Sequence, residues 1–437
     1  MEGGLSSEKA VAPKKNIAFF ITNAGKPTPA TGPVYPFTYD LLNTFFMKKM
    51  IAIHLKDDRS GSSLIFRQSL EALAEKGMTV HLITTRTNDT PGFLTDVPGI
   101  QYHYIRNYER GDKWRTFFSF LLAQLLIFRK VLGLIEPGDS VYINTLLPFG
   151  AAWAGRLKNA PITYHIHETA VHPAYMRKFL LYMAQQMATH VIFGSRYVKT
   201  QMNFPKSTHH IIHSCLPESF VQEALLHTNH GSRKTVLMIA SPGHESGVME
   251  LLQLAGLMPS TRFELVLNAS RKERKEFFGL RLIPDNVIVY GPQINLHPFY
   301  QRAAVVLNLS QTEHYQDIFD ISILQAMSYG RPVIVPLAGG ANELVAHGWN
   351  GYRISGHYLE QVRRHVEQLL HNKPLYADMS CAAQLVASQF KPQVFKQQVE
   401  DIFLEGNVFT PGRKKEQLAE VLLYPAALQD YINNSLN

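Results

Sequence analysis

Cysteine is almost absent from this sequence, and its scarcity excludes two classes of protein. The 437 residues include two cysteines, Cys215 and Cys381. Two thiols cannot build the disulfide framework of a small secreted domain, and they are too few for a zinc cluster. We interpret them as reduced thiols and expect a cytoplasmic protein.

Long hydrophobic runs are also missing. The longest apolar stretch, residues 117–128, is interrupted by Ser119 and Gln124 and is followed by Arg129 and Lys130. A membrane-spanning helix needs about 20 apolar residues, so this run is expected to be too short. Residues 1–15 lack the apolar core of a signal peptide, which again favours a cytoplasmic location.

Charged residues are few and unevenly distributed. They make up 18% of the chain against 46% hydrophobic residues, so the protein can bury sizeable cores. Residues 47–228 hold 20 Lys and Arg against 13 Asp and Glu, which suits an anionic partner. No nucleic-acid module accompanies this charge, so we do not expect nucleic acid as the partner. The basic, aromatic helix expected over 113–135 suits peripheral contact with the inner membrane face, although packing on a sheet is the favoured interpretation.

The pattern of the chain changes at Met47. Residues 16–22 are typical of a strand, but 25–36 contain four prolines and no helix follows to complete a βα unit. We interpret 1–46 as an N-terminal extension or as sequence upstream of the true start; an ordinary extra strand is the alternative.

From residue 50 onward, short apolar runs alternate with helical periodicity, which predicts parallel α/β sheets. A turn-rich stretch at 217–233 separates two such series and is expected to be a linker. The fold class is therefore two Rossmann-like lobes, 47–228 and 229–388, followed by C-terminal helices and a tail over 389–437. Residues 375–404 are expected to be helical and could return to the first lobe. The predicted strands are 51–55, 79–84, 101–105, 140–144, 162–167, 190–194 and 209–213 in the first lobe, and 235–240, 262–268, 286–290, 304–309, 332–336 and 352–354 in the second.

The most informative segment is 309–351, LSQTEHYQDIFDISILQAMSYGRPVIVPLAGGANELVAHGWNG. A strand is followed by a polar loop and a helix expected over 318–329, with Asp317 and Asp320 near its start. After the next strand, Gly339 and Gly340 open a helix expected over 341–347. Glycines let a ligand approach exposed amides at a helix start, where an anion is favoured. Both loops follow strand ends, where open α/β sheets bind ligands.

This segment resembles the donor site of retaining glycosyltransferases of the family-4 type, which have the GT-B fold of two facing Rossmann-like lobes. Order and spacing match at Asp317, Gln325, Ala326, Met327, Gly330, Pro332, Val333, Gly339, Gly340, Glu343, Leu344, Val345 and Gly351. The resemblance implies that Asp317 faces the donor sugar as a catalytic residue and that Gln325 binds the ribose hydroxyls. The amides of Gly339 and Gly340 would hold the diphosphate. The family places Glu at both motif positions, and a buried structural amide is the alternative for Gln325.

A second departure lies after the first strand of the second lobe. The family clamps the diphosphate there with Arg and Lys, and this chain has Ser241 and Ser246. Charge-assisted hydrogen bonds contribute roughly 1.5–3 kcal/mol each, so their joint loss would weaken binding by about 10²–10⁴-fold. His244 in the same loop, Arg59 in the first lobe, and Arg271 with Lys272 are candidate substitutes; the alternatives are a solvated loop residue for His244 and an exposed helical face for 271–275.

The first lobe offers an acceptor-side loop and a histidine. Gly61 and Ser62, with Arg59, stand where the family has a Gly-rich loop under the acceptor; the pattern is not a dinucleotide fingerprint. Strand 162–167 ends in His167, and the resemblance implies that a histidine here touches the donor sugar and supports catalysis. A structural histidine is the alternative. No ligand cluster is spaced for a metal.

The sequence thus predicts transfer of a hexosyl unit from a nucleotide diphosphate sugar, with a UDP-sugar favoured, to a glycan or lipid-linked acceptor. The resemblance implies a retaining, front-face reaction without metal or cofactor. Two alternatives stay open: a catalytically degenerate GT-B partner in polysaccharide assembly, motivated by the altered donor residues, and a GT-B sugar epimerase.

Overall fold

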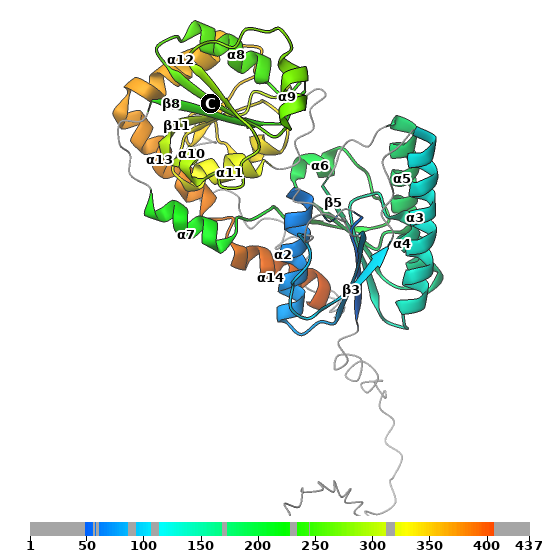
Figure 1. Ribbon diagram of the computed structural model, residues 1–437. Helices are drawn as coiled ribbons and strands as arrows, with labels where there is room; N and C mark the ends of the chain where they lie inside the picture. The colour runs from blue at the N-terminus through cyan, green and yellow to red at the C-terminus, as the bar shows by residue number, and fades with distance from the viewer. Residues whose placement is uncertain are drawn as a thin grey trace, which may run out of the picture. The chain divides into compact units, whose positions relative to one another are not determined.

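Two parallel sheets organise the part of the chain described by the computed structural model, which comprises residues 49–55, 57, 61–85, 93–105, 113–167, 173–227, 234–243, 245–311 and 320–405 (Figure 1). The first sheet has seven strands in the order β3-β2-β1-β4-β5-β6-β7, and the second has six in the order β10-β9-β8-β11-β12-β13. All strand pairs in both sheets are parallel. The predicted class of two Rossmann-like α/β lobes is confirmed; the extension 1–46 lies outside the described residues.

The first sheet is buried on both faces. Its strands are β1 (Met50–Ile53), β2 (Val80–Thr85), β3 (Ile100–Ile105), β4 (Ser140–Asn144), β5 (Ile162–Ile166), β6 (His190–Phe193) and β7 (Thr208–Ile211). Alternation along β1 sends Met50 and Ala52 into the core under one layer of helices, and Ile51 and Ile53 into the core under the other. This two-sided burial explains why the strands appear in the sequence as continuous apolar runs.

The helices around this sheet divide into two layers. One face is covered by α2 (Gly61–Glu75), and the other by α3 (Lys113–Leu134), α4 (Phe149–Leu157) and α5 (Ala174–Met187). The sheet order explains this division. Strands β1 to β3 extend the sheet in one direction, and β4 to β7 extend it in the other. Right-handed crossovers in opposite directions place their helices on opposite faces of the sheet. A short helix, α6 (Arg196–Thr200), follows β6.

Helix α3 corrects the expectation that no segment is long enough to cross a membrane. The helix continues past Arg129 and Lys130, and the 20-residue segment Arg115–Leu134 contains an 18-residue window with a mean hydropathy of 1.7. By length and composition alone it could cross a bilayer. One side of it, however, packs into the core of the sheet through Phe120, Ile127 and Val131.

The second sheet contains β8 (Thr235–Ala240), β9 (Arg262–Leu267), β10 (Val287–Tyr290), β11 (Ala303–Leu307), β12 (Val333–Val335) and β13 (Gly351–Arg353). Its helical elements are α7 (Glu218–Leu226), α8 (Val248–Leu257), α9 (Arg271–Phe278), α10 (His297–Arg302), α11 (Ile321–Ser328), the 3₁₀ helix η1 (Gly340–Leu344), α12 (Leu359–His371) and α13 (Lys373–Ala387). Two cores, one on each face of the sheet, hold these elements together.

Two local predictions were wrong in this region. The expected linker contains α7, because Phe220 and Ala224, one helical turn apart, are buried in the core of the second sheet. The helix expected over 341–347 is the five-residue 3₁₀ turn η1. Its continuation is blocked by Asn350, whose side chain accepts from the Ala346 amide at 2.8 Å and donates to the Leu344 carbonyl at 2.8 Å.

The last described elements of the chain pack against the first sheet. After α13, helix α14 (Pro392–Glu400) and the π-helical turn η2 (Asp401–Glu405) bury Phe395, Val399 and Phe403 in the same core as α2. The Phe403 ring lies 4.7 Å from that of Tyr142, and Lys396 pairs with Glu75 of α2 at 2.7 Å. The expected return of the tail to the first lobe is therefore present in the structure.

Candidate functional site

The loop after β8 is held by its own serine. Ser246 is 2% exposed, and its hydroxyl donates to the Gly243 carbonyl at 2.7 Å. Gly247 follows at φ 78°, the left-handed region, and a Cβ there would overlap the backbone of Leu309. Ser246 is thus used to close the turn before α8, while Ser241 is half-buried at its start. His244 lies outside the described residues.

A second loop, after β11, is bonded to this one. The Gln311 amide donates to the Glu245 carbonyl at 2.8 Å, and the Gln311 side chain donates to Glu250 of α8 at 2.6 Å. Because β8 and β11 are neighbours in the sheet, the two loops form one continuous rim at its carboxyl edge.

Helix α11 begins at Ile321, with Asp320 as its N-cap. The Asp320 carboxylate accepts from the Ser322 amide at 2.9 Å and from the Asn308 side chain at 2.8 Å, so it is a structural N-cap. Asp317 lies outside the described residues. Gln325 stands one turn into α11, half-buried, and its Oε1 accepts from the hydroxyl of Tyr300 at 2.9 Å. Burial raises the pKa of Tyr300, which keeps this hydroxyl protonated as a donor.

Gly339 and Gly340 follow β12, the next strand after β11 in the sheet. Gly339 has φ 96°, which favours glycine, and both residues are buried. Since η1 has five residues, the helix-dipole support expected for an anion is smaller than a full helix would give. A cationic side chain does lie at this loop. Arg353, at the end of β13, donates through Nη1 to the Asn342 side chain of η1 at 3.1 Å.

In the first lobe, a buried chain of polar side chains ends at His167. Nε2 of His167 lies 2.9 Å from Oδ1 of Asn144, and Nδ2 of Asn144 lies 2.9 Å from Nδ1 of His54. Nε2 of His54 is 2.9 Å from the hydroxyl of Ser63 in the first turn of α2. Asn144 also donates to the backbone carbonyl of Ser62 at 3.2 Å, so these hydrogen bonds extend to the predicted acceptor-side loop.

These contacts determine the proton positions. The Ser62 carbonyl can only accept, so the NH₂ group of Asn144 must face it, and the amide oxygen must face His167. His167 therefore carries its proton on Nε2 and keeps Nδ1 as the accepting nitrogen. His54 accepts from Asn144 through Nδ1 and donates through Nε2 to Ser63.

Burial keeps this histidine neutral. Desolvation, with a smaller contribution from the neighbouring His54, lowers the pKa of His167 to about 3. The ring of His165 lies 4.1 Å from that of His167, and burial also lowers the pKa of His165 well below its usual value. Tyr142 lies 2.7 Å from Nδ1 of His165. At neutral pH both rings are uncharged, so His167 would act by hydrogen bonding and not as a cation.

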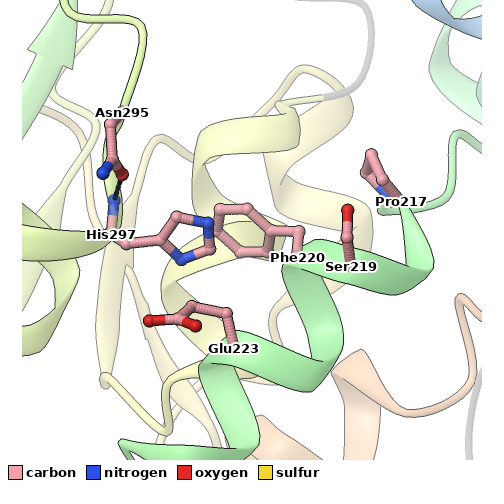
Figure 2. Close-up of a pocket in the computed structure, with 6 residues that line it drawn as sticks. All are labelled: Pro217, Ser219, Phe220, Glu223, Asn295 and His297. Carbon is pink, nitrogen blue, oxygen red and sulfur yellow. Dashed lines mark hydrogen bonds between the residues drawn. The ribbon is translucent and has the colours of Figure 1, made fainter.

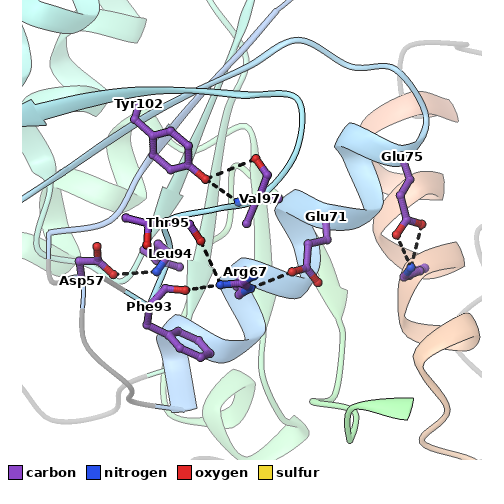
Figure 3. Close-up of polar contacts among 10 residues, drawn as sticks. Asp57, Arg67, Glu71, Glu75, Phe93, Leu94, Thr95, Val97 and Tyr102 are labelled. Atoms are coloured by element: carbon purple, nitrogen blue, oxygen red, sulfur yellow. Dashed lines mark hydrogen bonds and ion pairs between the residues drawn. The ribbon is translucent and has the colours of Figure 1, made fainter. Parts of the chain in front are cut away.

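Gly61 and Ser62 of the predicted acceptor-side loop are the first two residues of α2, and a second loop packs beside this helix (Figure 3). Asp57 accepts from the Leu94 amide at 2.8 Å, which ties the segment after β1 to the segment after β2. Arg67 of α2 donates to the carbonyls of Phe93 and Thr95. Both loops are thus fixed to one helix. Arg59 lies outside the described residues.

Glu343 joins the two lobes. Its carboxylate accepts from the amides of Arg196 at 3.0 Å and Tyr197 at 2.6 Å in α6, and lies 3.0 Å from Nε2 of His213. Glu343 is in η1, three residues after Gly340. These hydrogen bonds therefore connect the predicted phosphate loop to the first lobe.

An open hollow of about 470 Å³ lies elsewhere, between α7 and the start of α10 (Figure 2). It is lined by Pro217, Ser219, Phe220, Glu223, Asn295 and His297. The rings of Phe220 and His297 stack at 4.3 Å, and His297 lies 2.5 Å from the Tyr329 hydroxyl. The hollow contains none of the predicted site residues. In the described part of the chain, no group of three His, Cys, Asp or Glu side chains is placed to hold a metal.

Solved structures share this two-lobed fold. Sucrose-phosphate synthase from Thermosynechococcus elongatus is 18% identical with a TM-score of 0.66, over 82% of this chain and 98% of that one. HepE from Anabaena, solved with UDP and glucose, is 18% identical with a TM-score of 0.63, over 81% and 99% of the two chains. The fold is therefore GT-B.

Family models match each lobe. The Glycosyltransferase Family 4 model matches residues 60–215, and the Glycosyl transferases group 1 model matches 227–386. The chain belongs to the GT-B glycosyltransferases of the family-4 type.

Curated relatives match over shorter segments. An uncharacterized glycosyltransferase from Haemophilus influenzae is 24% identical over 163 residues, 36% of this chain. The N-acetyl-alpha-D-glucosaminyl L-malate synthase of Bacillus anthracis is 30% identical over 124 residues, 28% of this chain. These matches span 45% and 32% of the relatives' own lengths, less than half in each case.

Proposed function

We propose that the protein transfers a hexosyl unit from a UDP-sugar to a hydroxyl of a glycan or lipid-linked acceptor, with retention of configuration. The observation that carries the proposal is the rim of the second sheet. Gln325 on α11 and the Gly339–Gly340 loop follow two adjacent strands, β11 and β12, where a nucleotide and its diphosphate can be bound together. The structures of HepE with UDP and with UDP-glucose support this assignment.

The donor would be held by neutral groups and one cation. Tyr300 donates to Oε1 of Gln325, so Gln325 meets the ribose hydroxyls chiefly through its NH₂ group. The amides of the Gly339–Gly340 loop bind the diphosphate. Arg353, placed at that loop by Asn342, supplies the charge that Ser241 and Ser246 lack.

The reaction itself rests on positioning and charge stabilisation. The bond between the anomeric carbon and the diphosphate oxygen breaks, and the acceptor oxygen forms a new bond to the same face of that carbon. The leaving diphosphate takes the acceptor proton, so no separate base or cofactor is required. His167 contributes as a neutral imidazole oriented by Asn144, and Asp317 faces the donor sugar.

The test is titration calorimetry of the full chain with UDP, GDP and a panel of their sugars, followed by product analysis with candidate acceptors. We expect UDP to bind and Arg353→Ala to weaken it by about 10–100-fold, the value of one charge-assisted hydrogen bond. Arg281→Ala is the matched control, because Arg281 is an exposed arginine of the same lobe whose guanidinium donates to one backbone carbonyl. Absence of binding by every UDP- and GDP-sugar contradicts the proposal.

A catalytically degenerate partner is the second candidate, and the closed Ser246 loop favours it. The hydroxyl of Ser246 bonds back to Gly243, so nothing at this position reaches out toward a phosphate. Ser241→Arg, Ser246→Lys and Gln325→Glu together distinguish the two functions. A large gain in UDP binding supports degeneration, whereas a loss of native transfer activity supports an active site adapted to its own donor.

A further inference from the structure

The outer face of helices α3, α4 and α5 exposes an unusual number of large apolar side chains. Nine of them are between 39% and 69% exposed: Phe118, Leu121, Leu122, Leu125, Trp153, Leu157, Tyr175, Phe179 and Tyr182. The three helices form one layer on the first sheet (Figure 1). Their inner faces fill the core, so the outer residues are not needed for folding, and a contiguous exposed apolar surface of this kind marks an interaction site.

The pattern is most regular on α3. Arg115, Phe118, Leu122, Leu125 and Arg129 are spaced three and four residues apart, which places them in one straight stripe along the helix. The three apolar members are 63%, 52% and 54% exposed, and an exposed arginine stands at each end. Long cationic side chains at both ends of an apolar stripe can reach toward an anionic surface while their stems stay on apolar groups.

Aromatic rings connect the three helices. The Trp153 ring of α4 lies 6.5 Å from Phe128 of α3 and 6.3 Å from Phe149. Phe149 in turn lies 5.4 Å from Phe179 of α5. A row of rings therefore joins the three helices directly beneath the exposed residues, with Phe149 buried at its centre and Trp153 and Phe179 exposed.

The charge of this surface has one sign. Helices α3, α4 and α5 contain no Asp or Glu. Seven described basic side chains lie on them or at the α4 C-cap: Arg115, Arg129, Lys130, Arg156, Lys158, Arg177 and Lys178. A second copy of the chain is a poor occupant, because its cations would face these cations. An anionic lipid surface combines negative charge with an apolar interior, and this face presents cations together with exposed apolar side chains.

We propose that this face, the α3–α4–α5 surface, docks the protein on an anionic lipid bilayer. The helices lie in the membrane interface with their outer apolar residues among the acyl chains and their cations at the headgroups. The docking is peripheral. Crossing the membrane would remove Phe120, Ile127 and Val131 of α3 from the core. It would also separate α3 from α4, whose Gly150 amide donates to the Gln124 side chain at 3.0 Å. The surface lies on the lobe that carries the predicted acceptor loop, so it would bring a lipid-linked acceptor close to the enzyme.

The experiment is flotation of the full chain with vesicles of phosphatidylcholine alone or mixed with phosphatidylglycerol, at low and high salt. We expect binding to the anionic vesicles that falls with salt. Leu122→Ser/Leu125→Ser and Arg129→Glu/Lys130→Glu should each weaken it by at least about tenfold. All four side chains are exposed, so both variants should keep the unfolding temperature of the native protein.

Two controls match these variants in the second lobe. Leu280→Ser/Leu282→Ser removes leucines that are 101% and 93% exposed, and Arg271→Glu/Lys275→Glu reverses charges on the exposed helix α9. Both should bind vesicles as the native chain does. The proposal is overturned by absence of vesicle binding, by equal binding to phosphatidylcholine alone, or by equal effects of variants and controls. A dimer that Leu122→Ser/Leu125→Ser dissociates would assign the face to a second copy instead. No donor is present, so the outcome is independent of the transferase assay.

Discussion

Asn144 holds the buried polar chain of the first lobe together, so its replacement should affect stability and His167 in separable ways. The side chain is fully buried and bonds to His167, His54 and the Ser62 carbonyl. Asn144→Ala removes this partner from the buried rings of His167 and His54 and from the partly buried Ser62 carbonyl. Each such group costs about 1–3 kcal/mol of unfolding free energy. The groups are coupled and water can enter the space, which reduces the sum. We therefore take the lower end of the range and expect a total loss of at least about 3 kcal/mol.

Asn144→Asp tests the electrostatic part of the same argument. A carboxylate has nearly the same shape, but it cannot donate to Ser62, and its charge favours the protonated form of a neighbouring imidazole. The pKa of His167, about 3 in the native protein, should rise by about 1 to 3. If the neutral ring supports transfer, the rate of the variant should fall at acidic pH where that of the native protein is still flat.

The assays are guanidinium denaturation, NMR titration of the histidines and the pH dependence of transfer from a UDP-sugar. Asn286→Ala is the matched control: Asn286 bonds to the carbonyls of Ala255, Met258 and Thr261 in the second lobe, so it removes a similar network far from His167 in sequence and sheet. It should lose stability without changing the His167 titration. A loss below about 1 kcal/mol for Asn144→Ala, or identical pH profiles for Asn144→Asp and the native chain, refutes the reasoning.

Three further predictions concern packing, the connection between lobes and acid. Gly150→Ala should cost about 1–3 kcal/mol of unfolding free energy, because its Cβ would overlap the α3 backbone; Gly133→Ala, with open space around it, should not destabilise. Glu343→Ala removes the acceptor shared by two α6 amides. We expect faster proteolysis between the lobes and a higher KM for the donor. An unchanged KM would contradict a role of this contact in donor binding. Stability should fall between about pH 7 and pH 5 by about 2 kcal/mol for each of His165 and His167, because the unfolded rings gain a proton below about 6.5 and the folded rings do not; a flat denaturation midpoint would contradict this.

Much of the fold could be predicted because its signals are local. The apolar runs are strands buried on both sides, and the observed β1 and β8 lie within a residue or two of the predicted segments. The 3₁₀ turn η1 could not be predicted in this way. Ala341, Asn342 and Glu343 form a pattern typical of a helix, but Asn350 takes up the backbone groups that would continue it, and Glu343 bonds to α6, about 147 residues earlier in the chain.

In the predicted donor loops, too, the residues could be predicted from local sequence, whereas their contacts with distant segments could not. Gln325, Gly339 and Gly340 could be named from their spacing, whereas the partner of Gln325, Tyr300, comes from a helix 25 residues earlier. The missing cations at Ser241 and Ser246 are visible in the sequence. Arg353 is visible too, but nothing in its neighbourhood in the sequence connects it with Asn342; the contact depends on β13 pairing with β12.

The polar chain at His167 explains most directly why a site is harder to predict than a fold. His54, Asn144 and His167 are separated by about 90 and 23 residues, and each is a single polar residue at or just after a strand end. They meet because β1 pairs with β4 and β4 with β5, so that three carboxyl ends lie side by side. The runs of apolar residues determine that strands form, but only their order in the sheet brings these three residues together. A polar residue at the end of an otherwise apolar strand is therefore the sequence feature that indicates a candidate site residue. Which of these residues can form hydrogen bonds with one another depends on which strands are adjacent in the sheet.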